Sequence, residues 1–311
     1  MEKDSRIFPK LVKSSIAGTA GGMSSVLIGQ PFDIVKIRMQ AQCSINPIYR
    51  TPLHWIKAIL YNEGWRAFYK GTSAPLMSAG ICTSIRFWAN EASKKLFKRY
   101  NERRKKHNPH ILSSAQLAIC GAFAGMANSP VTTPIEHARI LLQNQNSLLD
   151  PRLRFRGSFD AIRRVFKEYG FRDVYRGYSI TVVRDGIFSA VFFGIYDIMK
   201  CKTTDPTKRP NLPWLMLLGS VWGVISWIPS YPFDVVKTKI QLEPFRAPFY
   251  KSYWDCFKKV YHKEGIKGFT MGLGTCLVRT TITSSTVIGV FELTLRYLEA
   301  KTHGHKVTVR P

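Results

Sequence analysis

Pro31-Phe-Asp33-Ile-Val-Lys36 is the first of three copies of one pattern, which recurs as Pro134-Ile-Glu136-His-Ala-Arg139 and Pro232-Phe-Asp234-Val-Val-Lys237. The prolines lie 103 and 98 residues apart, and a glutamine follows each basic residue by four positions. These glutamines are Gln40, Gln143 and Gln241. Because chance does not keep order and spacing constant across three copies, the chain contains an internal threefold repeat.

The proline pattern lies at the same place in each of three units, which span residues 10–105, 111–205 and 211–300. Each unit begins with a long uncharged segment, continues after the proline with a basic amphipathic stretch, and ends with a second helix. We expect these second helices over residues 72–98, 178–202 and 273–298. They carry charges at mid-length, which is costly at membrane depth unless the charges face protein or a watery cavity. The repeats therefore predict six spans around a polar interior.

The chain is both strongly basic and strongly apolar. Its 311 residues include 46 Lys and Arg against 20 Asp and Glu, and 45% of them are apolar, which excludes a disordered basic tail. Three runs without charge or histidine, 14–32, 111–135 and 211–233, are long enough to cross a bilayer. We expect an integral membrane protein that binds no nucleic acid. A basic peripheral protein on nucleic acid or a membrane surface is the less favoured alternative.

Signatures of catalysis and metal binding are missing from the sequence. The six cysteines and seven histidines form no metal-binding cluster, and there is no nucleophile elbow or phosphate-binding loop. We therefore expect no metal, no cofactor and no enzymatic activity.

The threefold pattern of proline, acid and base resembles the signature of the mitochondrial carrier family, as do Glu63-Gly64 and Tyr69-Lys70-Gly71 behind its first copy. The resemblance covers residues 10–300 and implies an all-α membrane protein. Six tilted transmembrane helices would form a threefold pseudosymmetric barrel with three short matrix helices and both termini toward the intermembrane space. Such carriers are multi-pass proteins of the mitochondrial inner membrane that move small metabolites by alternating access. We expect exchange of solutes and a monomer.

The family's pairing implies three ion pairs at the matrix side: Asp33 with Arg139, Glu136 with Lys237, and Asp234 with Lys36. We call these six residues the matrix network. Gln40, Gln143 and Gln241 correspond to the family's glutamine braces beneath the pairs. Buried ion pairs add little net stability because desolvation offsets their attraction, which suits a gate that opens in every cycle. Static salt bridges at helix ends are the alternative.

A second network is implied at the opposite side by an aromatic, acidic and basic pattern on the second helices. It consists of Glu91, Lys94, Tyr196, Asp197, Lys200 and Glu292, which we call the cytoplasmic network. The first copy lacks the aromatic residue and the third lacks the cation. Two pairs are expected, Glu91 with Lys200 and Glu292 with Lys94, and Asp197 has no expected partner. The matrix network should therefore be the tighter one, with the resting carrier open to the intermembrane space.

The family's substrate contacts, thirteen positions before the acids of the second helices, correspond to Ser78, Arg184 and Arg279. Asp185 follows Arg184, and Asp33 offers a further anionic contact. Arginine binds carboxylates bidentately, and aspartate binds a cation, so Arg184 and Asp185 favour a zwitterion such as an amino acid or a carnitine-like solute. The alternative is an anion, either a dicarboxylate or a nucleotide or coenzyme A species, bound by Arg184 alone.

Two further features depart from the symmetry. Arg86 has apolar counterparts in the other repeats and is a candidate substrate contact, or else the partner of a nearby acid. Lys70-Gly71 and Arg176-Gly177 resemble turns whose backbone N–H groups bind cardiolipin phosphate. The third copy of the turn, Thr270-Met271-Gly272, departs from that pattern.

Overall fold

The computed structural model describes residues 4–42, 49, 51–104, 112–145, 154–203, 212–246 and 248–307. Within these ranges the chain is helical, and no strand is present. The long helices are α1 (Asp4–Ala41), α3 (Ser73–Arg103), α4 (Ser114–Asn144), α7 (Tyr178–Thr203), α8 (Leu212–Gln241) and α10 (Leu273–Val307).

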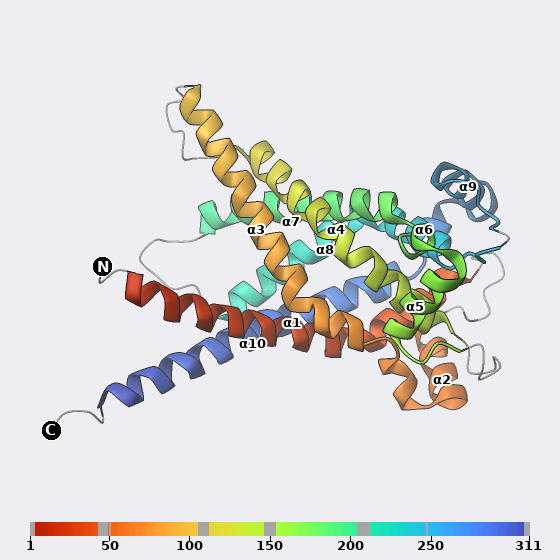
Figure 1. The fold of residues 1–311 in the computed structure, drawn as a ribbon, viewed down its shortest axis with the longest axis horizontal. Helices are drawn as coiled ribbons and strands as arrows, with labels where there is room; N and C mark the ends of the chain where they lie inside the picture. The colour runs from red at the N-terminus through yellow and green to blue at the C-terminus, as the bar shows by residue number, and fades with distance from the viewer. Residues whose placement is uncertain are drawn as a thin grey trace.

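Short helices connect the long ones at the end of the molecule opposite to both termini (Figure 1). They are α2 (Pro52–Glu63) with the 3-10 turn η1 (Trp65–Tyr69), α5 (Ser158–Tyr169) with α6 (Phe171–Val174), and α9 (Tyr253–Phe269). Gly64, Gly170 and Gly265 interrupt them with φ of 75°, 88° and 64°, which favours glycine because a Cβ would be strained. The sequence repeat thus becomes a repeat of local structure.

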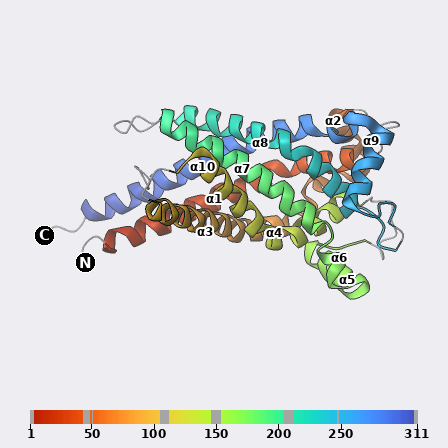
Figure 2. The ribbon, with the colours of Figure 1, turned by 90° about the horizontal axis from the view of Figure 1, so that it is seen from above.

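The long helices form a closed ring in the order α1, α3, α4, α7, α8, α10 and back to α1. Figure 2 shows α3 and α4 along one side and α8 along the other. Pro31, Pro134 and Pro232 lie inside α1, α4 and α8, where proline removes a backbone hydrogen bond and bends the helix. The long helices diverge toward the end that carries the termini and come together at the other end (Figure 1).

Burial is inverted relative to a soluble protein. Lys237, Gln40 and Asp185 are at most 1% exposed, whereas Trp88 is 73% exposed and Leu293 also faces outward. An apolar surface around a polar centre is favourable where lipid covers the outside. Among the residues that the structure describes, one segment, 273–298, is long and apolar enough to suggest a span by itself. The other spans rest on the repeat and on this surface.

Candidate substrate site and matrix network

A cavity of about 370 Å³ lies inside the ring and is lined by residues of all six long helices. Its charged lining consists of Asp33, Lys36, Arg86, Glu136, Arg139, Arg184, Asp185, Asp234, Lys237 and Arg279. Six of these side chains are cationic and four are acidic, so the lining carries two more positive than negative charges. The cavity therefore suits a substrate with at least one carboxylate.

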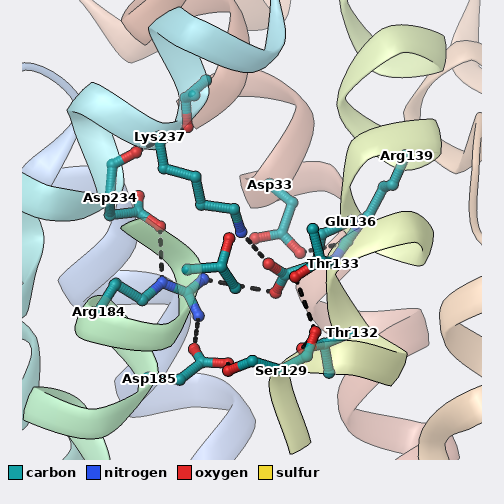
Figure 3. A network of polar contacts seen from close by, with 12 residues as sticks. Asp33, Ser129, Thr132, Thr133, Glu136, Arg139, Arg184, Asp185, Asp234 and Lys237 are labelled. Atoms are coloured by element: carbon teal, nitrogen blue, oxygen red, sulfur yellow. Dashed lines mark hydrogen bonds and ion pairs between the residues drawn. The ribbon is translucent and has the colours of Figure 1, made fainter. Parts of the chain in front are cut away.

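The structure brings the matrix network together in the predicted pairs. Lys36 Nζ lies 2.6 Å from Asp234 Oδ2. Arg139 contacts the Asp33 carboxylate, and Lys237 contacts that of Glu136 (Figure 3). The pairs connect α1, α4 and α8, the three helices that contain the repeated prolines, in one cycle. These helices are thereby tied together at the end where the short helices lie.

The expected glutamine braces are only partly present. Gln40 donates from Nε2 to Asp234 Oδ2 at 3.2 Å and to the Tyr231 hydroxyl at 3.1 Å, so it supports the Lys36–Asp234 pair. Gln241 instead donates to the backbone carbonyl of Arg176 at 2.9 Å. The side-chain amide of Gln143 is buried without a hydrogen-bond partner in the described structure. The brace is therefore observed in one repeat.

Gln30 is a residue that the sequence reasoning missed. It is fully buried, its Oε1 accepts from Arg139, and its Nε2 donates to the backbone carbonyl of Lys70 at 2.8 Å. It thus supports the Asp33–Arg139 pair from the α1 side. The available signal was the one amide side chain in the uncharged run of residues 14–32, directly before the repeated Pro31.

Arg184 on α7 reaches the carboxylates of three acids. It contacts Asp185, its Nε lies 3.2 Å from Asp234 Oδ1, and its Nη2 lies 3.4 Å from Glu136 Oε1 (Figure 3). Its guanidinium also lies over the Trp227 ring, 5.5 Å from the ring centroid. The arginine predicted to bind substrate is thus held by two acids of the matrix network.

Asp185 is buried because α7 packs closely on α4. A Cβ placed on Gly125 would lie 2.2 Å from the Asp185 carbonyl oxygen, so this approach requires glycine. Ser129, one turn further along α4, donates to Asp185 Oδ2 at 3.4 Å (Figure 3). The Asp185 carboxylate thus contacts Arg184 through Oδ1 and lies within reach of the Ser129 hydroxyl through Oδ2, a hydroxyl that it shares with the Gly125 carbonyl.

The other predicted substrate residues, Arg279, Asp33, Ser78 and Arg86, have different contacts from those of Arg184 and Asp185. Arg279 Nε is 2.7 Å from Asp33 Oδ1, so Asp33 is shared between Arg139 and Arg279. The Ser78 hydroxyl donates to the carbonyl of Pro75 in its own helix at 3.3 Å. The residue with which α3 lines the cavity is Arg86.

Three copies of one family model match this chain. The model is described as mitochondrial carrier protein, and the matches cover residues 9–101, 111–206 and 209–302. The chain belongs to the mitochondrial carrier family. It is a transporter rather than an enzyme, a multi-pass protein of the mitochondrial inner membrane with the six-helix carrier fold.

Curated relatives of this carrier match over almost their full length. The chain is 35% identical to the glutamate/glycine mitochondrial carrier of Schizosaccharomyces pombe over 92% of this chain and 94% of that protein. It is 34% identical to the mitochondrial glycine transporter of Saccharomyces cerevisiae, over 93% of this chain and 92% of the relative. It is 32% identical to the mitochondrial basic amino acids transporter of Homo sapiens, over 95% of each chain.

The cytoplasmic network of the carrier differs from the matrix network. Glu91 lies 4.0 Å from Lys94 on the same helix, and Glu292 lies 2.8 Å from Arg296 on α10. These described pairs each lie within one helix, in the second halves of α3 and α10, and these two helices run toward the end where the long helices diverge (Figure 1). The side chains of Tyr196, Asp197 and Lys200 lie outside the described residues.

The predicted lipid turns use their cations for contacts within the carrier. Lys70 contacts Glu63, and Arg176 donates from Nη1 to the Glu243 carbonyl at 2.8 Å. The backbone turn is the same in all three repeats, because Gly71, Gly177 and Gly272 have φ of 78°, 83° and 78°. The third turn therefore keeps the conformation although its sequence departs from the pattern.

Glu63 and Tyr169 occupy equivalent places and are held by different interactions. Glu63 is paired with Lys70 and with Arg38 Nη1, which lies 2.6 Å from its Oε1. Burial raises the pKa of Glu63, but the bonds from Arg38 and Lys70 outweigh it and hold the pKa below its ordinary value. Tyr169 instead stacks on Phe245 with ring centroids 4.2 Å apart. An aromatic contact thus replaces the ion pair in the second repeat.

Proposed function

We propose that this carrier exchanges a small zwitterionic amino acid across the mitochondrial inner membrane by alternating access. The observation that carries the proposal is the adjacent Arg184 and Asp185 in the charged cavity. The guanidinium is suited to the α-carboxylate and the aspartate to the α-ammonium group. A carnitine-like solute has the same two charges, but the relatives named above are described as carriers of glutamate, glycine or basic amino acids, which favours an amino acid.

The contacts of the two arginines suggest how binding is coupled to opening. Arg184 and Arg279 are bound to Glu136, Asp234 and Asp33, which belong to the matrix network. A substrate carboxylate that binds these arginines competes with the acids and rearranges the network. A ligand shifts a conformational equilibrium by its difference in affinity for the two states. The competition between the substrate carboxylate and the acids provides such a difference in affinity. The paired matrix network and the divergent opposite end support a resting state open to the intermembrane space.

A carrier of an anionic metabolite is the alternative, and the excess of two positive charges in the cavity favours it. The two functions differ in their need for Asp185. Neutralising Asp185 should abolish transport of a zwitterion, whereas it should spare or improve transport of a dicarboxylate or nucleotide.

Counter-exchange in liposomes that contain cardiolipin tests the proposal. Labelled glycine, glutamate, lysine, carnitine, a dicarboxylate and ADP are offered to the wild-type carrier and to Arg184→Ala and Asp185→Asn. Arg99→Gln is the control, because Arg99 is exposed on α3. We expect uptake of an amino acid that both site variants lose and the control keeps. Uptake of dicarboxylate or ADP alone, or amino-acid uptake that survives Asp185→Asn, would contradict the proposal.

We also propose that the carrier acts as a monomer, because one ring of helices contains a complete cavity. Cardiolipin would bind at the turns of Gly71 and Gly177 through backbone N–H groups, since Lys70 and Arg176 have protein partners. Light scattering of the purified carrier in detergent checks the first statement. Thermal stabilisation by added cardiolipin, compared with a zwitterionic lipid, checks the second.

A further inference from the structure

One cation of the cavity lining has no carboxylate partner among the described residues. Arg86 lies on α3, and its observed contact is to Asn128 on α4. With the Asn128 amide turned so that Oδ1 faces Arg86, this oxygen accepts from Nε at 2.9 Å and from Nη2 at 3.2 Å. A neutral amide leaves the positive charge uncompensated, and a guanidinium has five N–H donors, so donors remain for a ligand.

The remaining cations of the lining are each bound to an acid. These cations are Lys36, Arg139, Arg184, Lys237 and Arg279. A substrate carboxylate that binds one of them must displace a protein carboxylate, whereas a carboxylate that binds Arg86 displaces none. Arg86 is therefore the anion-binding group that is available before the matrix network rearranges.

Arg86 borders the same region of the cavity as the proposed amino-acid site. Asn128, which contacts Arg86, directly precedes Ser129, whose hydroxyl lies 3.4 Å from Asp185 Oδ2, so α4 connects Arg86 to Asp185. The two groups come from different helices, α3 and α7. The equivalent positions in the other repeats are the apolar Phe192 and Val287. A cation is therefore present at this position in the first repeat and not in the other two. An asymmetric cation of this kind suits one particular end of an asymmetric substrate.

We infer that Arg86 determines specificity by binding the side-chain carboxylate of an acidic amino acid. The inference rests on the proposed function, in which Arg184 and Asp185 hold the α-carboxylate and the α-ammonium group. Glutamate or aspartate would then use both sites, glycine would use the first alone, and lysine would meet repulsion at Arg86.

Arg86→Gln tests the inference in counter-exchange, because glutamine keeps much of the length and the hydrogen bonds but not the charge. We expect kcat/KM for glutamate to fall about tenfold or more, mainly through KM, since hydrogen bonds to a charged group are lost. Glycine uptake should fall much less. Arg86→Lys should recover part of the glutamate uptake, and Arg99→Gln on the same helix should leave both rates unchanged. Equal losses for glutamate and glycine would overturn the inference.

Asn128→Asp provides a second test in which Arg86 stays in place. The substitution is nearly isosteric and puts a carboxylate against the guanidinium, so we expect the same selective loss of glutamate uptake. Unchanged glutamate uptake in a folded Asn128→Asp carrier would also overturn the inference. Failure of the proposed function has a different result, namely glutamate uptake that survives Asp185→Asn.

Discussion

The two ends of the ring each contain a charged network that derives from the sequence repeat. The two networks differ in how far their side chains are buried and in whether their described pairs join separate helices. At the end that carries the short helices, Asp234 has a side chain 4% exposed and is paired across helices with Lys36 and Arg184. At the other end, the Glu91 side chain is 62% exposed and its described pair, Lys94, lies on the same helix. A pair that joins helices holds them together, whereas a pair within one helix does not. Among the described side chains, the pairs of the matrix network therefore join α1, α4 and α8, whereas the described pairs of the cytoplasmic network each lie within one helix.

The largest expected effect comes from breaking one pair at each end. Asp234→Asn leaves Lys36 with a neutral partner and takes one of three carboxylates from Arg184, and removing a partner from a buried pair costs about 3–5 kcal/mol. Glu91→Gln removes an exposed partner and should change the free energy of unfolding by at most about 0.5 kcal/mol. Thermal unfolding of the carrier in detergent measures both. Equal destabilisation would mean that the two networks are held equally.

A smaller and pH-dependent effect is expected at Glu63, which lies outside the spans at the end of the short helix α2. Because its pKa is lowered in the folded carrier, Glu63 stabilises the fold above its ordinary pKa. This contribution is lost as the pH falls through the lowered folded-state pKa. Glu63→Gln should therefore be less stable than the wild type at neutral pH, and the difference should shrink in acid. A difference that is constant between neutral and acidic pH would contradict this account.

Gln40 and Gln143 allow a glutamine that braces an ion pair to be compared with a glutamine that is only buried. Gln40→Leu removes the bonds to Tyr231 and Asp234 and should cost about 1 kcal/mol for the net loss of hydrogen bonding. Gln143→Leu replaces an amide without described partners by an apolar side chain of similar volume and should be neutral or stabilising. Thermal unfolding of the two variants side by side measures the difference, and the reverse order would refute it.

The smallest expected effect comes from completing the cytoplasmic network. Leu295→Lys supplies the cation missing from the third repeat as a partner for Asp197 and should favour closure of that end by about 0.5–1 kcal/mol. Closure should slow the reaction of an impermeant maleimide, added from the intermembrane-space side, with Ser284→Cys in the cavity lining. Leu295→Gln is the neutral control. An unchanged reaction rate would show that a third pair does not close this end.

Much of the fold follows from local spacing and could be predicted. The interval between Pro31, Pro134 and Pro232 defines the repeats, and the helices expected at 178–202 and 273–298 begin at Tyr178 and Leu273. The cyclic pairs of the matrix network were also predictable, because the resemblance carries a pairing rule that needs only residue positions. The roles of Gln30 and Gln143 could not be predicted, because the hydrogen-bond partner of an amide depends on which neighbouring group lies within about 3 Å.

The sequence by itself determined the threefold repeat, the six-span arrangement and the residue types of the cavity, because each is a matter of order, spacing and charge along the chain. Only the tertiary structure decided how those charges are shared. Arg184 binds acids 48 and 50 residues away, and Arg86 lies against Asn128 rather than against an acid. Such contacts are decided by which faces of separate helices meet, and the approach of α7 to α4 at Gly125 is one example. No periodicity within a single segment specifies that geometry.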